Sequence, residues 1–257
     1  MKLICCLLLL VPFAAAQQTP VQPATQNAPQ PVATAPPIPT PAQITHMETM
    51  LEDWPDLARY RAENAAIAAP VPGEDRVVFM GDSITDMWGH GSAFFPGKPY
   101  VNRGISGQTT PQMLIRFRPD VIALKPKVVV ILAGTNDIAG NTGLSTPETT
   151  EDNLMSMVDL AKANNIRVVL ASILPAASYP WKPGIDPVEQ IRTLNTWMRN
   201  YCATNGCIYL DYYSPMVNTE NGMKKELTID GVHPSPAGFQ IMAPLAEKAI
   251  AQALQTK

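Results

Sequence analysis

The stretch Val77-Val78-Phe79-Met80-Gly81-Asp82-Ser83-Ile84-Thr85 decides how this chain folds. Its first four residues are all apolar, a pattern typical of a strand buried on both faces of a parallel sheet. The apolar run stops at Gly81, and Ser83 follows where the chain has to leave the sheet. Ligands of open α/β sheets bind just beyond the carboxyl ends of the strands, so Ser83 is a candidate functional residue. The alternative is that Asp82 and Ser83 only cap the next helix.

Length and composition favour one large α/β domain. The chain has 257 residues, of which 46% are hydrophobic and 16% are charged, and its formal net charge is −3. A chain of this size can bury a full hydrophobic core. Its nearly balanced charge gives no indication of a nucleic-acid partner or of an acidic membrane surface as a partner.

Residues 1–16 have the pattern of a signal peptide. Lys2 precedes the apolar run 3–13, which is too short to span a bilayer, and Ala14-Ala15-Ala16 suits cleavage. Cys5 and Cys6 lie within the apolar run, so we do not expect a lipid anchor on either. The mature protein is therefore expected to be secreted or periplasmic, without stable membrane insertion; an uncleaved membrane anchor is the alternative.

Residues 17–43 consist almost entirely of Pro, Ala, Gln, Thr and Val. Such a segment cannot bury enough apolar surface to offset the entropy lost on ordering, and its prolines favour extended conformations. We expect a disordered linker here that acts as a spacer. A proline-rich ligand for a partner protein is the alternative.

From residue 44 onward the sequence predicts one folded domain, with a core over residues 76–254, in which strands alternate with helices. Such alternation is typical of a parallel sheet covered by helices on both faces. Strands are expected at 76–80, 100–105, 127–133, 168–173 and 208–210. Helices are expected at 47–68 (interrupted by Pro55), around 113–117, at 147–164, from Pro187 to a stop at Gly206, and at 236–254.

Two cysteines, Cys202 and Cys207, follow the predicted cleavage site. In an oxidising compartment we expect them to form a disulfide between the end of a helix and the start of a strand. Two buried free thiols are the alternative, because such a corner need not meet the geometry of a disulfide. Without neighbouring histidines the pair cannot complete a zinc site, and no metal is predicted.

Three further polar clusters follow predicted strands. They are residues 102–109, 134–137 and 230–234, and a parallel sheet would bring all three to the edge where Ser83 lies. The tendency of polar residues to form turns does not by itself explain why four such clusters, counting the one that contains Ser83, all follow predicted strands. The edge of the sheet is therefore the predicted functional site.

The motifs Gly-Asp-Ser-Ile-Thr (81–85), Gly-Ile-Ser-Gly (104–107), Gly-Thr-Asn-Asp (134–137) and Asp-x-x-His-Pro (230–234) resemble, in this order, the signature blocks of the SGNH (GDSL) hydrolases. That family includes esterases, lysophospholipases, thioesterases, carbohydrate deacetylases and relatives of the platelet-activating-factor acetylhydrolases. The resemblance covers residues 76–254. It implies a flavodoxin-like three-layer α/β/α sandwich with five parallel strands in the order 2-1-3-4-5.

The predicted chemistry follows from these residue types. The Ser83 hydroxyl needs a base to remove its proton, and His233 is the candidate, oriented by Asp230. The resemblance implies an oxyanion hole made of the Ser83 and Gly107 backbone N–H groups and the Asn136 side-chain amide. A side chain at Gly107 would obstruct the substrate. The Gly-x-Ser-x-Gly motif of the common α/β-hydrolases is absent from the sequence.

For the residues next to the predicted catalytic residues, the sequence gives less specific predictions. Asp82 and Asp137 are expected to brace their own loops by accepting backbone N–H bonds. The segment 175–186 is long enough to form the lip of a cleft. The candidate substrate-binding residues are Tyr179 and Trp181 in this segment, and Trp88 in the segment after Ser83.

The sequence therefore predicts an exported serine esterase that works through an acyl-enzyme, without metal or cofactor. Short loops and the absence of a long apolar insertion favour small acyl groups such as acetyl, carried by a carbohydrate or another small or polymeric ester. A lysophospholipase or thioesterase acting on longer acyl chains is the alternative. An alternative of another class is a catalytically inactive carbohydrate-binding module.

Overall fold

The computed structural model describes residues 39–90, 94–143 and 145–255. The predicted signal peptide and most of the predicted linker lie outside the described residues. From Pro41 onward the chain forms one compact unit. Its first helix, α1 (Pro41–Glu52), begins within the predicted linker, because a proline is well tolerated in the first turn of a helix.

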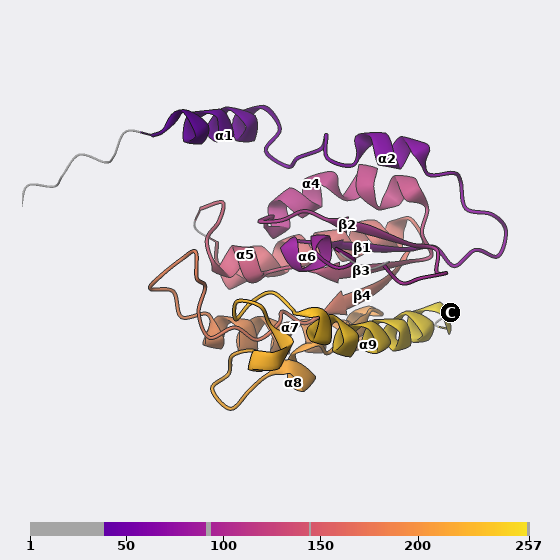
Figure 1. Cartoon of the computed structure of the whole chain (residues 1–257). Coiled ribbons are helices and arrows are strands. Elements are labelled where there is room, and N and C mark those ends of the chain that lie inside the picture. The colour runs from indigo at the N-terminus through magenta and orange to yellow at the C-terminus, as the bar shows by residue number, and fades with distance from the viewer. Residues whose placement is uncertain (1–38, 91–93, 144, 256–257) are drawn as a thin grey trace, which may run out of the picture. The chain divides into compact units, whose positions relative to one another are not determined.

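Five parallel strands form one sheet in the order β2-β1-β3-β4-β5, which confirms the expected topology (Figure 1). Every residue of β1 and β3 is buried, as expected for unbroken apolar runs in the middle of a parallel sheet. The strands are β1 (Val77–Gly81), β2 (Tyr100–Gly104), β3 (Val128–Leu132), β4 (Arg167–Ala171) and β5 (Ile208–Leu210).

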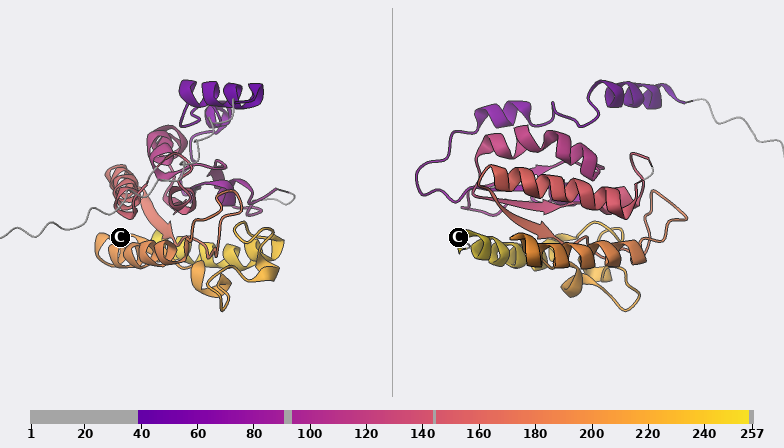
Figure 2. Two further views of the ribbon diagram at one scale, coloured as in Figure 1. Left: turned by 90° about the vertical axis from the view of Figure 1, so that its left-hand side faces the viewer. Right: turned by 180° about the vertical axis from the view of Figure 1, so that it is seen from behind.

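Helices cover both faces of this sheet (Figures 1 and 2). Val78, Met80 and Ile131 point to one face, where they pack with α4 (Thr110–Asp120), α6 (Pro147–Ala163) and α7 (Val188–Asn205). Phe79 and Val130 point to the other face, where they pack with α9 (Pro236–Gln255), the yellow helix of Figure 1. The shorter helices are α2 (Arg61–Ala66), α3 (Ser83–Asp86), α5 (Thr135–Ile138), α8 (Tyr213–Met216) and the 3-10 turns Ile122–Leu124 and Lys225–Leu227.

The helical segment predicted over residues 47–68 is interrupted at Pro55 as expected, but the interruption is longer than one residue. Residues 53–60, most of them in turns, separate α1 from α2. The Asp53 side chain accepts hydrogen bonds of 2.8 Å from the backbone N–H groups of Leu57 and Ala58. These bonds stabilise a turn in place of a helix, next to Pro55, which has no N–H to donate to the turn before it.

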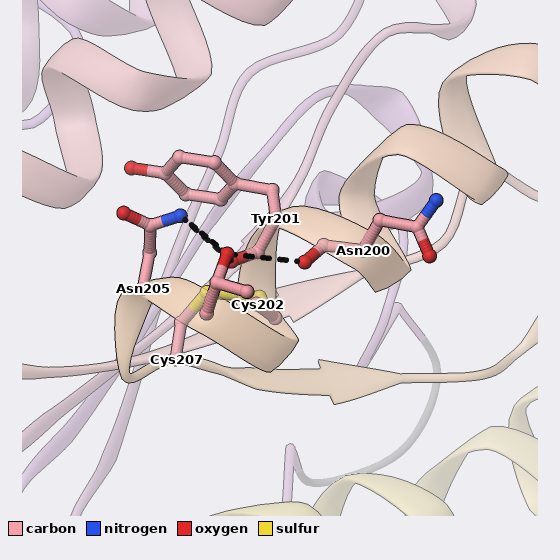
Figure 3. The surroundings of a disulfide bond; sticks show 6 residues. Asn200, Tyr201, Cys202, Asn205 and Cys207 are labelled. Carbon is pink, nitrogen blue, oxygen red and sulfur yellow. Dashed lines mark hydrogen bonds between the residues drawn. A yellow bond between two sulfur atoms is a disulfide. The ribbon is translucent and has the colours of Figure 1, made fainter.

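The structure confirms the disulfide between Cys202 and Cys207 (Figure 3). Cys202 lies in the last turn of α7, and Cys207 directly precedes β5. Gly206 adopts φ +65°, which ends the helix and brings the two Cα atoms to 4.6 Å. The disulfide therefore lies at the amino end of β5, away from the carboxyl ends of the strands.

None of the helices in the described ranges is long and apolar enough to cross a membrane.

Candidate active site

The register of the strands brings three loops together at the carboxyl edge of the sheet. Gly81, the last residue of β1, pairs with Gly104 of β2 and with Leu132 of β3. A Cβ at Gly104 would lie 2.1 Å from the backbone N of Asp86, so only glycine lets β2 approach α3 this closely. The loops after β1, β2 and β3 therefore start side by side.

Ser83, His233 and Asp230 form a chain of hydrogen bonds at this edge. The Ser83 Oγ lies 2.8 Å from His233 Nε2, and His233 Nδ1 lies 2.7 Å from Asp230 Oδ2. When Nδ1 carries the ring proton and donates a hydrogen bond to Asp230, Nε2 is unprotonated and can accept the proton of the Ser83 hydroxyl. The arrangement thus provides a nucleophile, a base and a group that orients the base.

A tight turn holds Asp230 and His233 in this geometry. Asp230 Oδ1 accepts hydrogen bonds from the backbone N–H groups of Val232 at 2.9 Å and His233 at 2.8 Å. Burial alone would raise the pKa of Asp230, but these bonds, together with the His233 ring and its charge, hold the pKa below its ordinary value. Asp230 is therefore a carboxylate at neutral pH, able to stabilise an imidazolium.

Asp82 braces the turn beneath Ser83. Its Oδ1 accepts a hydrogen bond of 3.0 Å from the Ile84 N–H, as predicted. Its Oδ2 is buried and has no hydrogen-bond partner among the described residues. Burial raises the pKa of this carboxyl to about 7, with the negative charge of Asp137 adding to the effect.

The side chain of Asn136 has a defined orientation at the amino end of α5. Its Nδ2 donates to the Gln108 carbonyl at 3.0 Å, and its Oδ1 accepts from Asn141 Nδ2 at 2.7 Å. An amide nitrogen has two hydrogens, so one N–H of Asn136 is left to donate to a ligand. Asn141 Nδ2 also lies 3.4 Å from the Gly107 carbonyl, which links Asn136 to the loop after β2.

The backbone N–H groups of Ser83 and Gly107 donate to no acceptor within the described ranges, so both are available to a ligand. Gly107 has φ +81°, a left-handed conformation that favours glycine. A Cβ there would meet no protein atom within 4 Å, so protein atoms do not crowd this position. Nearby, Asp137 accepts hydrogen bonds of 3.1 Å from the Thr110 N–H and of 2.5 Å from its hydroxyl, so it braces its loop as predicted, but against the start of α4.

The structure places the three candidate substrate-binding aromatic residues in different environments. Trp181 lies at the site: its ring centroid is 6.1 Å from that of His233, and 38% of the residue is exposed. Tyr179 is buried and packs against Trp181, with ring centroids 5.1 Å apart. Trp88 is also buried and stacks on Phe239, because its apolar ring gains more from the core than from solvent.

A hollow of about 590 Å³ lies between the segment after α3 and the start of α9. Its apolar wall includes Trp88, Phe239 and Pro234, the residue after His233. Lys98 and Glu247, which form an ion pair of 3.5 Å, lie at its rim. This hollow therefore lies between Trp88 and the turn that carries His233.

Sequence reasoning missed three polar residues that the structure places around the site, namely Gln108, Arg116 and Asn141. One signal was present for Arg116, because it shares a helix face with Met113, Phe117 and Asp120 at spacings of three and four residues. A charged residue within an apolar face is uncommon unless it is paired. Gln108 belongs to the polar cluster 102–109 that was expected at this edge, although no signal gave it a role there, and no signal distinguishes Asn141 from ordinary loop residues.

The described residues contain no group of three or more His, Cys, Asp or Glu side chains that could hold a metal ion.

A five-stranded α/β sandwich with a hydrogen-bonded Ser, His and Asp beyond its strand ends defines a class of ester-hydrolysing enzymes. The chain belongs to the GDSL-like lipase/acylhydrolase family, whose family model matches residues 79–241.

The chain is similar to several proteins of known sequence or structure. A GDSL-like lipase from Bacteroides thetaiotaomicron VPI-5482 is 46% identical, with a TM-score of 0.75, over 78% of this chain and 99% of that chain. An acetylxylan esterase of Geobacillus stearothermophilus is 36% identical over 88 residues, or 25% of this chain and 40% of that protein. The uncharacterized lipoprotein YqeF of Bacillus subtilis (strain 168) is 35% identical over 79 residues, or 29% of this chain and 32% of the lipoprotein. The chain thus spans less than half the length of these two proteins.

Proposed function

We propose that this chain hydrolyses carboxylic esters through an acyl-enzyme formed on Ser83. The observation that carries the proposal is the 2.8 Å contact between Ser83 Oγ and His233 Nε2, continued by the 2.7 Å contact to Asp230. A hydroxyl in contact with an oriented imidazole is the arrangement that activates a serine nucleophile. A carbohydrate-binding module without activity would have no use for it.

The reaction has two steps. Ser83 Oγ forms a bond to the acyl carbon while its proton moves to His233 Nε2; the tetrahedral intermediate then expels the alcohol, which takes that proton from His233. In the second step water attacks the acyl-enzyme, loses its proton to His233, and the Ser83 oxygen leaves with that proton as the acid is released. Asp230 stays ionised throughout and stabilises the imidazolium.

The negative oxygen of each tetrahedral intermediate needs hydrogen-bond donors that are already in place. The free N–H groups of Ser83 and Gly107 and the second N–H of the Asn136 amide are the proposed donors. Removing one such donor typically costs about 3 to 4 kcal/mol of transition-state stabilisation.

For the substrate, we infer a small acyl group such as acetyl on a carbohydrate. Two observations support it: the 36% identity of part of the chain to an acetylxylan esterase, and the exposed indole of Trp181 beside His233. Aromatic faces provide large contact area with sugar rings at little entropic cost. The second candidate is the hydrolysis of longer acyl esters, which the apolar hollow beside Trp88 and Phe239 supports.

For the location, we infer export through the signal peptide predicted at residues 1–16. The similarity of part of the chain to the lipoprotein YqeF supports an extracytoplasmic protein. Expression of the full chain followed by fractionation and N-terminal sequencing of the mature protein tests the inference, with Gln17 expected as the first residue. Retention of an intact N-terminus in the cytoplasm would contradict it.

Labelling with a fluorophosphonate and an ester-hydrolysis assay test the proposed activity. The wild-type protein is expected to be labelled and active, whereas Ser83→Ala and His233→Ala are expected to be folded but inactive, and the double variant no worse than either. Ser156→Ala, a change at a half-buried serine of α6 away from the site, is the matched control and should behave as wild type. Near-normal turnover by folded Ser83→Ala protein would refute the mechanism.

A further inference from the structure

A fully buried guanidinium lies behind the proposed oxyanion hole. Arg116, on the inner face of α4, has 0% of its surface exposed. Its nitrogens donate four hydrogen bonds: to Gln108 Oε1 at 2.5 Å, to the Arg103 carbonyl at 2.9 Å, to Asp120 Oδ2 at 3.1 Å and to the Gly81 carbonyl at 2.9 Å. Arg116 therefore contacts the ends of β1 and β2 and the loop that follows β2.

The two carbonyl contacts join the strands at the point where the catalytic loops begin. Gly81 is the last residue of β1 and is followed directly by Asp82 and Ser83, and its carbonyl also accepts from Ile105 N–H at 3.0 Å. The planar guanidinium has donors at fixed angles, so it holds the two carbonyls at a fixed separation. The Ser83 N–H lies two residues beyond Gly81, so these contacts restrict the movement of the segment that carries it.

The contact to Gln108 reaches the other two proposed donors. Gln108 directly follows Gly107, so holding its side chain limits the movement of the Gly107 N–H. Its backbone carbonyl accepts the hydrogen bond of 3.0 Å from Asn136 Nδ2. Its side chain also donates to the Pro55 carbonyl at 2.7 Å, so that Gln108 is held from two sides.

The charge of Arg116 is compensated within the same cluster. Asp120 is buried, and besides Arg116 it accepts a hydrogen bond of 2.6 Å from Asn64 Nδ2. Replacing a buried ion pair by apolar residues of similar volume is often neutral or stabilising, so stability alone is a weak reason for burying one here. Two of the other three Arg116 contacts, to Gly81 and to Gln108, lead to donors of the proposed oxyanion hole.

We propose that Arg116 is a positioning residue that holds the Ser83, Gly107 and Asn136 donors in the arrangement that the tetrahedral intermediate requires. It acts through Gly81 and Gln108 and does not touch the substrate. The inference rests on the proposed esterase function. It predicts that weakening the Arg116 contacts lowers kcat with little effect on KM, because the donors act on the transition state and not on the bound ester.

Arg116→Lys tests this proposal directly. The ammonium group keeps the charge opposite Asp120 but cannot donate to Gln108, Gly81 and Arg103 at the angles of the guanidinium. We expect kcat for an acetyl ester to fall about 10- to 100-fold, as is typical when catalytic groups are displaced by about 1 Å, with KM within about twofold of wild type. The rate of Ser83 labelling by a fluorophosphonate should fall in parallel, since that reaction uses the same donors.

Arg76→Lys is the matched control. Arg76 is also buried and bonds to the Leu124 carbonyl at 3.0 Å and to Glu74 at 2.8 Å, but it lies at the amino end of β1, away from the site. It should lose thermal stability as Arg116→Lys does and keep the wild-type kcat.

Gln108→Met provides a second test that leaves the Arg116–Asp120 pair in place. It removes the connection between Arg116 and the loop of Gly107, and a fall in kcat at unchanged KM is again expected. Wild-type kcat in folded Gln108→Met, or in folded Arg116→Lys, would overturn the positioning role while leaving the esterase function intact. A wild-type protein that hydrolyses no ester and takes no label would refute the function itself.

Discussion

The indole Nε1 of Trp181 donates a hydrogen bond of 3.0 Å to Oδ1 of Asn141, and Asn141 Nδ2 in turn donates to Asn136 Oδ1 at 2.7 Å. The exposed ring beside His233 is thereby connected to the amide proposed for the oxyanion hole. Two loops that are far apart in the sequence, one after α5 and one before α7, meet in this contact. Trp181 is therefore held in one position without being buried.

Two substitutions of Trp181 should distinguish the contribution of its aromatic face from that of its N–H group. Trp181→Phe keeps an aromatic face but removes the bond to Asn141, and we expect a fall in kcat of less than about fivefold. Trp181→Ala removes the face, and KM for an acetylated xylo-oligosaccharide should rise about 2- to 10-fold, the equivalent of an aromatic contact of roughly 0.5 to 1.5 kcal/mol. Steady-state kinetics with 4-nitrophenyl acetate, which has no sugar, provides the control. Equal KM changes for both substrates would contradict a role in binding carbohydrate.

Acyl chain length should distinguish the two candidate substrates. We expect acetyl and butyryl esters to be cleaved with higher kcat/KM than esters of ten or more carbons. A chain that entered the apolar hollow beside Phe239 would gain about 0.8 kcal/mol for each buried methylene, and kcat/KM would rise steadily with length. Such a rise, lost again in Phe239→Ala, would favour the longer-chain alternative.

Asp82 makes the stability of the protein depend on pH. Its pKa is about 7 in the folded protein, above the ordinary value of 3.8 in the unfolded chain. The folded state thus holds a proton that the unfolded state releases, and the contribution to stability present below pH 3.8 is lost as pH rises to about 7, by up to about 1.4 kcal/mol per unit. Asp82→Asn lacks this term, so its free energy of unfolding relative to wild type should increase between pH 4 and 7. A constant difference between the two proteins across denaturant titrations in this range would contradict the assignment.

The disulfide should contribute to stability but not to catalysis. Closing the short loop between Cys202 and Cys207 restricts the unfolded chain, which corresponds to about 2 kcal/mol. We expect Cys202→Ser/Cys207→Ser to lower the free energy of unfolding by this amount and to leave kcat unchanged, because the bond lies at the amino end of β5. Thiol titration of denatured, unreduced wild-type protein should detect neither cysteine. Two titratable thiols would contradict the pairing.

The sequence by itself determined the class of fold and the order of the strands along the chain. The apolar runs that become β1 and β3 have the composition of strands buried on both faces, and their alternation with helical segments leaves few topologies. Ser83 and Asn136 were identifiable because each follows a strand within a recognisable motif, and His233 because it belongs to the Asp-x-x-His-Pro motif. Hydrophobic pattern and local turn chemistry are encoded in neighbouring residues, so both can be read from the sequence.

Only the tertiary structure decided which of the other side chains surround the site. Trp88 and Trp181 are equally aromatic in the sequence, yet Trp88 packs into the core against Phe239 and Trp181 stays exposed beside His233. Arg116 reaches Gly81 across thirty-five positions of the chain, a contact that no local pattern contains. Such contacts arise when the sheet and its helices pack together, because only then do residues distant in sequence compete for the same space and the same hydrogen-bond partners.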